Sequence, residues 1–333
     1  MTTQLEPAAV RSSPEPPRPS SSLRGLILLA VLVLLAAAIV LIRMNGGPGP
    51  AAGGAATALP QGETIRAPGS TDHAIGRSGE SVISYRLPGV VVRGPRSQRH
   101  TMTDIAHLVQ AAIPRVTAVW GSHWARHAVV EIPATEAELA KLSGDRGDLA
   151  RIAAVTSAEI SSRRGRQALS DDRIVINPRV WPTLDRTGAR VVLTHELTHV
   201  ATGAVTGAAT PRWLVEGFAD YVGFRGSGLA LRAVARELER AVRTKGVPRR
   251  LPPDAAFDAG DPHLARAYEL AWLACRYIAA RAGQPALVRF YRLVGRAGAG
   301  PKAVLRRALR VVLDLTPSEF RQGWRRYVEA RLT

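Results

Sequence analysis

Residues 189–202 read ARVVLTHELTHVAT and lie between two glycines. Their apolar residues recur at a helical period, so we expect a single helix over this stretch. His195 and His199 are four positions apart and therefore lie on one face of that helix, where both imidazoles can bind a single cation. Glu196 follows the first histidine directly, so its carboxylate is placed to reach a water molecule on that cation and not the cation itself.

A second helix is expected over residues 211–224, because Pro211 suits a first helical turn and an apolar pattern follows it. Glu216 lies 17 positions after His199, which leaves room for a loop and an antiparallel return. Hydrolytic zinc sites use three protein ligands and keep one position open, so Glu216 is a candidate third ligand. Asp220, one turn further on the same face, is a candidate acceptor for the spare N–H of a ligand histidine.

Together, the two helices carry the pattern His195-Glu196-x-x-His199 followed by Trp213-Leu214-x-Glu216-Gly217-Phe218-Ala219. This pattern resembles the gluzincin metallopeptidases, the group of thermolysin and the membrane-alanyl-type aminopeptidases, and most of all their peptidase MA-like bacterial members. The resemblance implies a zincin-like domain with one zinc ion held by His195, His199 and Glu216. It also implies Glu196 as the general base and Asp220 as the carboxylate that orients a ligand histidine. The motif covers residues 195–221.

The chain departs from the family pattern in two respects. It has no Gly-Ala-Met-Glu-Asn-like segment, the element with which aminopeptidases grip a free N-terminus, so the resemblance does not imply exopeptidase activity. It also has no motif for the tyrosine or histidine that stabilises the transition state. Tyr268 is our candidate oxyanion donor, with Tyr221 and His263 as alternatives, and Tyr268 could equally be a core aromatic.

The remaining pattern predicts strands first and helices second, which is typical of an α+β domain with a small N-terminal mixed sheet and a helical C-terminal part. A helix is expected from about residue 103, with Pro114 kinking or interrupting it. We leave open whether residues 80–100 are strands or a partly ordered arm. Strands are expected at 128–132, 152–156 and 173–176, and further helices at 136–142, 229–244, 263–282, 285–294, 302–313 and from Thr316 onward. Strand 173–176, just before the site helix, is expected to be an edge strand that pairs with an extended substrate.

The N-terminal region predicts a membrane anchor. Residues 26–42 contain no polar side chain, and as a helix they span roughly 25 Å, at the short end for a bilayer. Arginines are more frequent before this run than after it, so we expect residues 1–24 to be a disordered cytoplasmic tail and 25–43 a transmembrane helix. A cleaved signal peptide is the alternative, but the apolar run is longer than usual and no small-x-small site follows it directly.

Beyond the anchor we expect a flexible linker and partly ordered arm at 44–100 and the peptidase MA-like domain at 101–333.

The chain has 45 Lys+Arg against 27 Asp+Glu, a formal net charge of +18, and nearly all of this basic excess is arginine. No nucleic-acid-binding module accompanies the charge, so no nucleic-acid partner is expected. Weak contact of basic helix faces with anionic lipid or wall polymers remains a minor alternative. A single cysteine excludes an internal disulfide.

We therefore expect a zinc peptidase at the cell membrane, with an extracytoplasmic catalytic domain that binds one Zn²⁺ per chain. It would hydrolyse a peptide or protein substrate through a metal-activated water, with Glu196 as the general base. The alternative is a non-catalytic peptidase-like module that binds peptides or anionic envelope components. The intact Glu196 disfavours this alternative, because a module that needs metal only for folding could lose that carboxylate.

Overall fold

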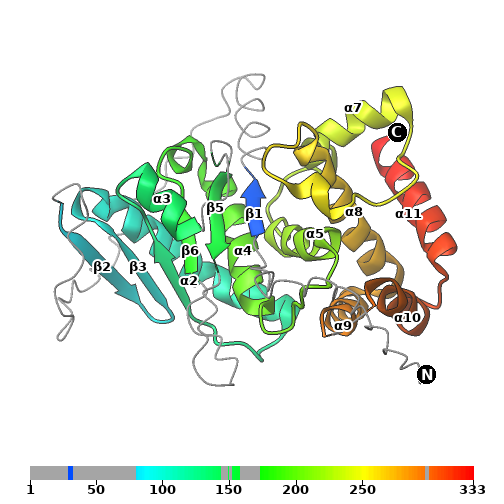
Figure 1. Cartoon of the computed structure of the whole chain (residues 1–333), viewed down its shortest axis with the longest axis horizontal. Helices are drawn as coiled ribbons and strands as arrows, with labels where there is room; N and C mark the ends of the chain where they lie inside the picture. Colours follow the sequence, from blue (N-terminus) through cyan, green and yellow to red (C-terminus); the bar gives the residue numbers. More distant parts are fainter. Residues whose placement is uncertain (1–28, 33–79, 144–148, 150–151, 158–172, 297–299) are drawn as a thin grey trace, which may run out of the picture.

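A computed structural model describes residues 29–32, 80–143, 149, 152–157, 173–296 and 300–333. Over these residues the chain is an α+β protein, mostly helical, with a small mixed sheet. Figure 1 shows the sheet at one end of the molecule and the C-terminal helices at the other, with α4 (Arg186–Thr202) and α5 (Arg212–Gly223) between them. The two helices that carry the sequence motif therefore lie where the two parts meet.

The sheet has six strands among the described residues, in the order β1-β5-β6-β4-β3-β2. Strands β3, β4 and β6 run parallel, while the pairs β2–β3, β5–β6 and β1–β5 are antiparallel. Their bounds are Leu29–Leu32 (β1), Val82–Leu87 (β2), Val90–Pro95 (β3), Ala128–Glu131 (β4), Ile152–Ser157 (β5) and Arg173–Ile176 (β6). The three strands predicted after residue 120 are thus confirmed. The edge position predicted for residues 173–176 is wrong, because β6 lies inside the sheet between β5 and β4.

The hairpin of β2 and β3 belongs to this sheet. Val90 of β3 pairs with Ala128 of β4 in parallel register, and Tyr85, Val90 and Val92 are buried in the main core. The two strands lie within the segment 44–100 that we predicted as linker and arm. The sheet therefore begins before residue 101, the predicted start of the domain.

The helices lie where the apolar periodicity predicted them. Besides α4 and α5 they are α2 (Arg99–Trp120), α3 (Glu136–Ser143), α6 (Leu231–Val234), α7 (Arg236–Lys245), α8 (Leu264–Ala282), α9 (Gln284–Gly295), α10 (Pro301–Leu313) and α11 (Pro317–Leu332), with short 3₁₀ turns at Arg96–Gln98 (η1), Trp181–Thr183 (η2) and Asp254–Phe257 (η3). The predicted helix 229–244 is divided at Ala235 into α6 and α7. The predicted capping box at Thr316 is confirmed, with Thr316 and Glu319 bonding each other's backbone N–H.

Helix α2 continues through Pro114 and does not end there. A proline inside a helix removes one backbone hydrogen bond and crowds the preceding turn. One face of α2 nevertheless stays buried on both sides of the proline, from Ile105 and Val109 to Val116, against the sheet and α4. Packing along this face holds the helix together where the local sequence would weaken it.

Strand β1 comes from the run that we predicted to cross a membrane. It pairs antiparallel with β5, and Leu29 lies opposite Thr156. The remainder of the predicted anchor 25–43, the tail 1–24 and residues 44–79 of the linker lie outside the described residues. No helix in the described part of the chain is both long and apolar enough to cross a membrane.

Helices α5 and α8 approach each other closely at Gly217. A Cβ atom at this position would lie 2.3 Å from the carbonyl oxygen of Ala271, and a backbone atom cannot turn away. Gly217→Ala should therefore force the two helices apart and lower the free energy of unfolding by about 1–3 kcal/mol. Chemical denaturation measures this, with Gly260→Ala as the control, because a Cβ on Gly260 meets nothing within 4 Å. Equal stability of the two variants would contradict the close packing.

Candidate metal centre

Helix α4 is buried along its whole central part. Every residue from Val191 to His199 is buried, because the helix passes between α2, the sheet and α5. Buried polar side chains need hydrogen-bond partners, and two threonines find theirs on the helix itself. Thr194 donates to the carbonyl of Arg190, and Thr198 donates to that of Thr194, each at 2.7 Å. The remaining polar side chains of this stretch, which can interact with groups outside the helix, are His195, Glu196 and His199.

The two histidines converge on one point, where a carboxylate from α5 joins them. Their Nε2 atoms lie 2.7 Å apart, and Oε2 of Glu216 lies 3.4 Å from that of His195 and 3.6 Å from that of His199. The three ligand atoms all fall within 4.8 Å of one another, and all three residues are buried. The structure thus brings together the three residues that the sequence predicted as ligands, and this cluster could hold a metal ion.

The carboxylate of Glu216 is the strongest sign that a cation fits here. Glu216 is fully buried, and within the described part of the chain neither of its oxygens has a hydrogen-bond partner. A buried charge is costly unless it is paired or coordinates a metal. Two imidazole nitrogens and one carboxylate oxygen form a donor set that transition-metal ions accept. The residues present therefore fit a bound divalent ion.

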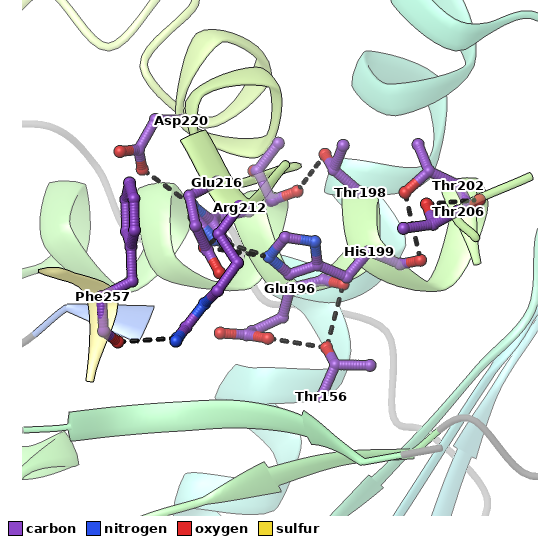
Figure 2. A network of polar contacts seen from close by, with 12 residues as sticks. Thr156, Glu196, Thr198, His199, Thr202, Thr206, Arg212, Glu216, Asp220 and Phe257 are labelled. Carbon is purple, nitrogen blue, oxygen red and sulfur yellow. Dashed lines mark hydrogen bonds and ion pairs between the residues drawn. The ribbon is translucent and has the colours of Figure 1, made fainter. Parts of the chain in front are cut away.

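Asp220 supports the cluster from the next turn of α5. Its Oδ1 lies 2.7 Å from Nδ1 of His195, and Asp220 is buried as well. A carboxylate at this nitrogen holds the proton on Nδ1, which leaves the lone pair of Nε2 directed at the cluster. Figure 2 shows Asp220 and Glu216 side by side on the same helix. The predicted contact between Asp220 and a ligand histidine is thus present.

Asp220→Asn tests the importance of this contact. We expect the variant to bind its metal about 10-fold to 100-fold more weakly, because it loses the charge that fixes the ring of His195. Competition with a chromophoric chelator measures the affinity. Asp314→Asn is the control, since Asp314 is exposed and only bridges to Arg310. Unchanged affinity in Asp220→Asn would show that the carboxylate does not orient a ligand.

The two histidines differ in their affinity for protons when no metal is present. Burial acts to lower the pKa of His195, but the charge and hydrogen bond of Asp220, with help from Glu216 and Glu196, raise it to about 10. Burial and the neighbouring His195 lower the pKa of His199 to about 4. Burial would raise the pKa of Glu216, but its contacts with both histidines hold it below the usual value. A proton on His195 therefore holds the metal-free cluster together, and a metal ion must displace it.

Glu196 lies between the cluster and strand β5. Its Oε2 accepts a hydrogen bond of 2.6 Å from the hydroxyl of Thr156, while Oε1 is buried and has no partner within the described residues. Burial raises the pKa of Glu196 to about 8, although His195 and Thr156 act to lower it. Figure 2 shows Glu196 directed toward Thr156, with His199 beside it. The carboxylate thus has one oxygen anchored to the sheet and one oxygen available.

Thr156 and Arg212 are two residues of the site that the sequence did not reveal. Thr156 and Ser157 are the two polar residues at the end of strand β5, and nothing in this local pattern distinguishes the role of Thr156. Arg212 begins α5 and donates to the carbonyl of Phe257 at 2.6 Å and to Asp258 at 2.7 Å. It thereby ties η3 to the helix that carries Glu216.

Tyr268, the candidate oxyanion donor, is buried on α8 against the ring of Phe257, with centroids 5.2 Å apart. Burial raises its pKa well above the usual value, and the charges of Glu216, Asp220 and Glu196 contribute, so its hydroxyl lies within electrostatic reach of the site. Its catalytic role stays a prediction. Of the two alternatives, Tyr221 has its hydroxyl beside Arg225, and His263 is exposed at the start of α8.

No family model matches this chain, and no curated protein matches it. The geometry of the buried cluster, with Glu196 on one side of it and Asp220 on the other, is therefore the basis for inferring a function.

Proposed function

We propose that this chain is a zinc-dependent peptidase of the gluzincin type with a zincin-like fold, which hydrolyses peptide bonds. The proposal rests on one observation, the buried cluster of His195, His199 and Glu216 with the half-anchored carboxylate of Glu196 beside it. Zinc is the proposed ion because two imidazoles and one carboxylate are the protein ligands of several hydrolytic zinc enzymes, in which the fourth position stays open. The order of strands and helices and the spacing of the motif are compatible with this family.

The residues around the cluster have different roles in the proposed hydrolysis. When bound, zinc supplies a Lewis acid that lowers the pKa of water and polarises a carbonyl oxygen. Glu196 takes a proton from the attacking water through Oε1, because Thr156 already occupies Oε2. A pKa raised by burial toward neutrality suits a general base, since it can accept a proton and release it again. Asp220 keeps His195 in the orientation in which Nε2 would face a bound ion.

Anchoring in the membrane by residues 25–43 is part of the proposal. It requires Leu29–Leu32 to leave β5, because the same backbone groups cannot pair with a strand and span a bilayer as a helix. The edge of β5 beside Thr156 would then be open to pair with an extended substrate backbone. Fractionation of cells that express the full chain tests this, and recovery of the protein only in the soluble fraction would contradict it.

The proposed activity is tested with the full chain in a non-ionic detergent. We expect one zinc ion per chain by elemental analysis and cleavage of members of a peptide library by mass spectrometry. A zinc chelator should stop the cleavage, and added zinc should restore it. Cleavage that persists in zinc-free protein would refute the proposal. One zinc ion per chain without cleavage of any peptide would instead indicate a peptidase-like binding module.

A further inference from the structure

A hollow lies on the helical part of the molecule. It has a volume of about 510 Å³, within the range of small-molecule sites. It lies between the end of α5 with the loop that follows it, the second half of α8 and the end of α11. None of the three candidate metal ligands, and neither Glu196 nor Asp220, lines it. The hollow, which we call the arginine pocket, is therefore distinct from the metal cluster, although Tyr221, the residue after Asp220, belongs to its lining.

Three arginines give the pocket its charge. Arg225, Arg276 and Arg331 line it, and its lining contains no aspartate or glutamate. None of the three takes part in a salt bridge with another residue of the described chain. Three like charges around one hollow repel one another, so an anion bound in the hollow would stabilise them.

Two of the three guanidinium groups lie over aromatic rings. The Cζ atom of Arg276 lies 4.9 Å from the centre of the Trp272 ring, and that of Arg331 lies 5.1 Å from the centre of the Tyr327 ring. Stacking of this kind orients the planar group while it leaves the N–H edge available for hydrogen bonds. The Nε atom of Arg276 is in fact buried without a hydrogen-bond partner among the described residues.

The pocket also offers neutral groups. Arg225 hydrogen-bonds the hydroxyl of Tyr221, and both Arg225 and Arg276 act electrostatically on that hydroxyl. Phe224, Leu229 and Tyr327 contribute apolar surface to the lining. A ligand that matches the whole lining therefore needs an anionic end and an apolar part. Guanidinium forks prefer the planar or tetrahedral oxygens of carboxylate and phosphate.

We propose that the arginine pocket binds a small organic anion, with its carboxylate or phosphate oxygens on Arg225, Arg276 and Arg331 and its apolar part on the aromatic side chains. The ligand is bound reversibly and undergoes no reaction here. Binding needs neither the metal nor Glu196, so it does not depend on the proposed peptidase activity.

Isothermal titration calorimetry of the zinc-loaded full chain in non-ionic detergent tests the proposal. The probes are benzoate and phenyl phosphate, which carry the two candidate anionic groups on the same ring, and benzamide as the neutral analogue. We expect saturable binding of at least one anion at millimolar concentration or below, and binding of benzamide at least about tenfold weaker. Binding of benzoate alone would identify a carboxylate ligand, and binding of phenyl phosphate alone a phosphate ligand.

The variants locate the binding. Arg225→Gln combined with Arg276→Gln should weaken binding about tenfold or more, whereas Arg306→Gln combined with Arg307→Gln, on the exposed face of α10, removes the same charge and should change nothing. Arg225→Gln alone keeps the test informative if the double variant misfolds, because Arg225 is exposed, and it too should weaken binding. Absence of saturable binding by both anions, equal binding of benzamide, or an equal loss in the α10 variant would overturn the proposal.

Discussion

Replacing Glu196 with glutamine is expected to abolish peptide hydrolysis while one zinc ion stays bound to each chain. Glutamine keeps the size of the side chain and an oxygen that can accept from Thr156, but it cannot take a proton from water. General-base catalysis contributes about 10²-fold to 10⁴-fold, so kcat/KM should fall by at least this factor. Rates on the best library peptide and zinc content by elemental analysis measure the two parts of the expectation.

Glu269→Gln is the matched control for this variant. Glu269 is a half-buried glutamate that accepts hydrogen bonds from the backbone N–H groups of Glu237 and Leu238 at the start of α7. Loss of a carboxylate that caps a helix is expected to affect stability and to leave the chemistry in place. If Glu196→Gln cleaved peptides at the rate of the unmodified chain, the assignment of Glu196 as the base would be wrong.

The second large effect is expected from His199→Ala, which removes one of the three candidate ligands. Loss of a residue that only orients a ligand costs 10-fold to 100-fold in metal affinity, so loss of a ligand should cost more than about 100-fold. An ion that binds only the folded chain stabilises it, by about 2.7 kcal/mol at a hundred times its dissociation constant. Zinc should therefore raise the melting temperature of the unmodified chain and not that of His199→Ala, which should also be inactive.

A second pair of histidines provides the control for this experiment. His123 and His127 are also four positions apart, but both are exposed in the segment before β4. Their replacement by alanine should leave zinc content, melting temperature and hydrolysis unchanged. If His199→Ala retained zinc with unchanged affinity, the ion would have to bind somewhere other than the cluster.

Features that depend on local sequence were predictable. The helices α4 and α5 follow from apolar periodicity, and the capping box at Thr316 follows from a short motif with a local mechanism. The ligand set was predictable for the same reason, since His195 and His199 share one turn of a helix and Glu216 lies on the helix that follows. Asp220 was predictable as well, because it lies one helical turn after Glu216 and therefore on the same face of α5.

Features that depend on distant pairing were not predictable from the pattern. Thr156 meets Glu196 across 40 positions, and nothing in the apolar strand around it indicates which face of the sheet meets α4. The order of the strands is likewise non-local, which is why residues 173–176 were expected at an edge and are found inside the sheet. The arginine pocket combines three helices and a loop, and the sequence shows only scattered arginines.

The close contact of Gly217 with Ala271 has a consequence for how the site assembles. Because α5 lies close to α8 at Gly217, Glu216 is carried by a helix that packs on the C-terminal helices, whereas both histidines are carried by α4, which packs on α2 and the sheet as well as on α5. An ion in the cluster is then a cross-link between two parts of the molecule. A chain whose helical part has not yet docked on its sheet would lack the third ligand. If the chain is the proposed peptidase, it would therefore gain hydrolytic activity only after the two parts have docked.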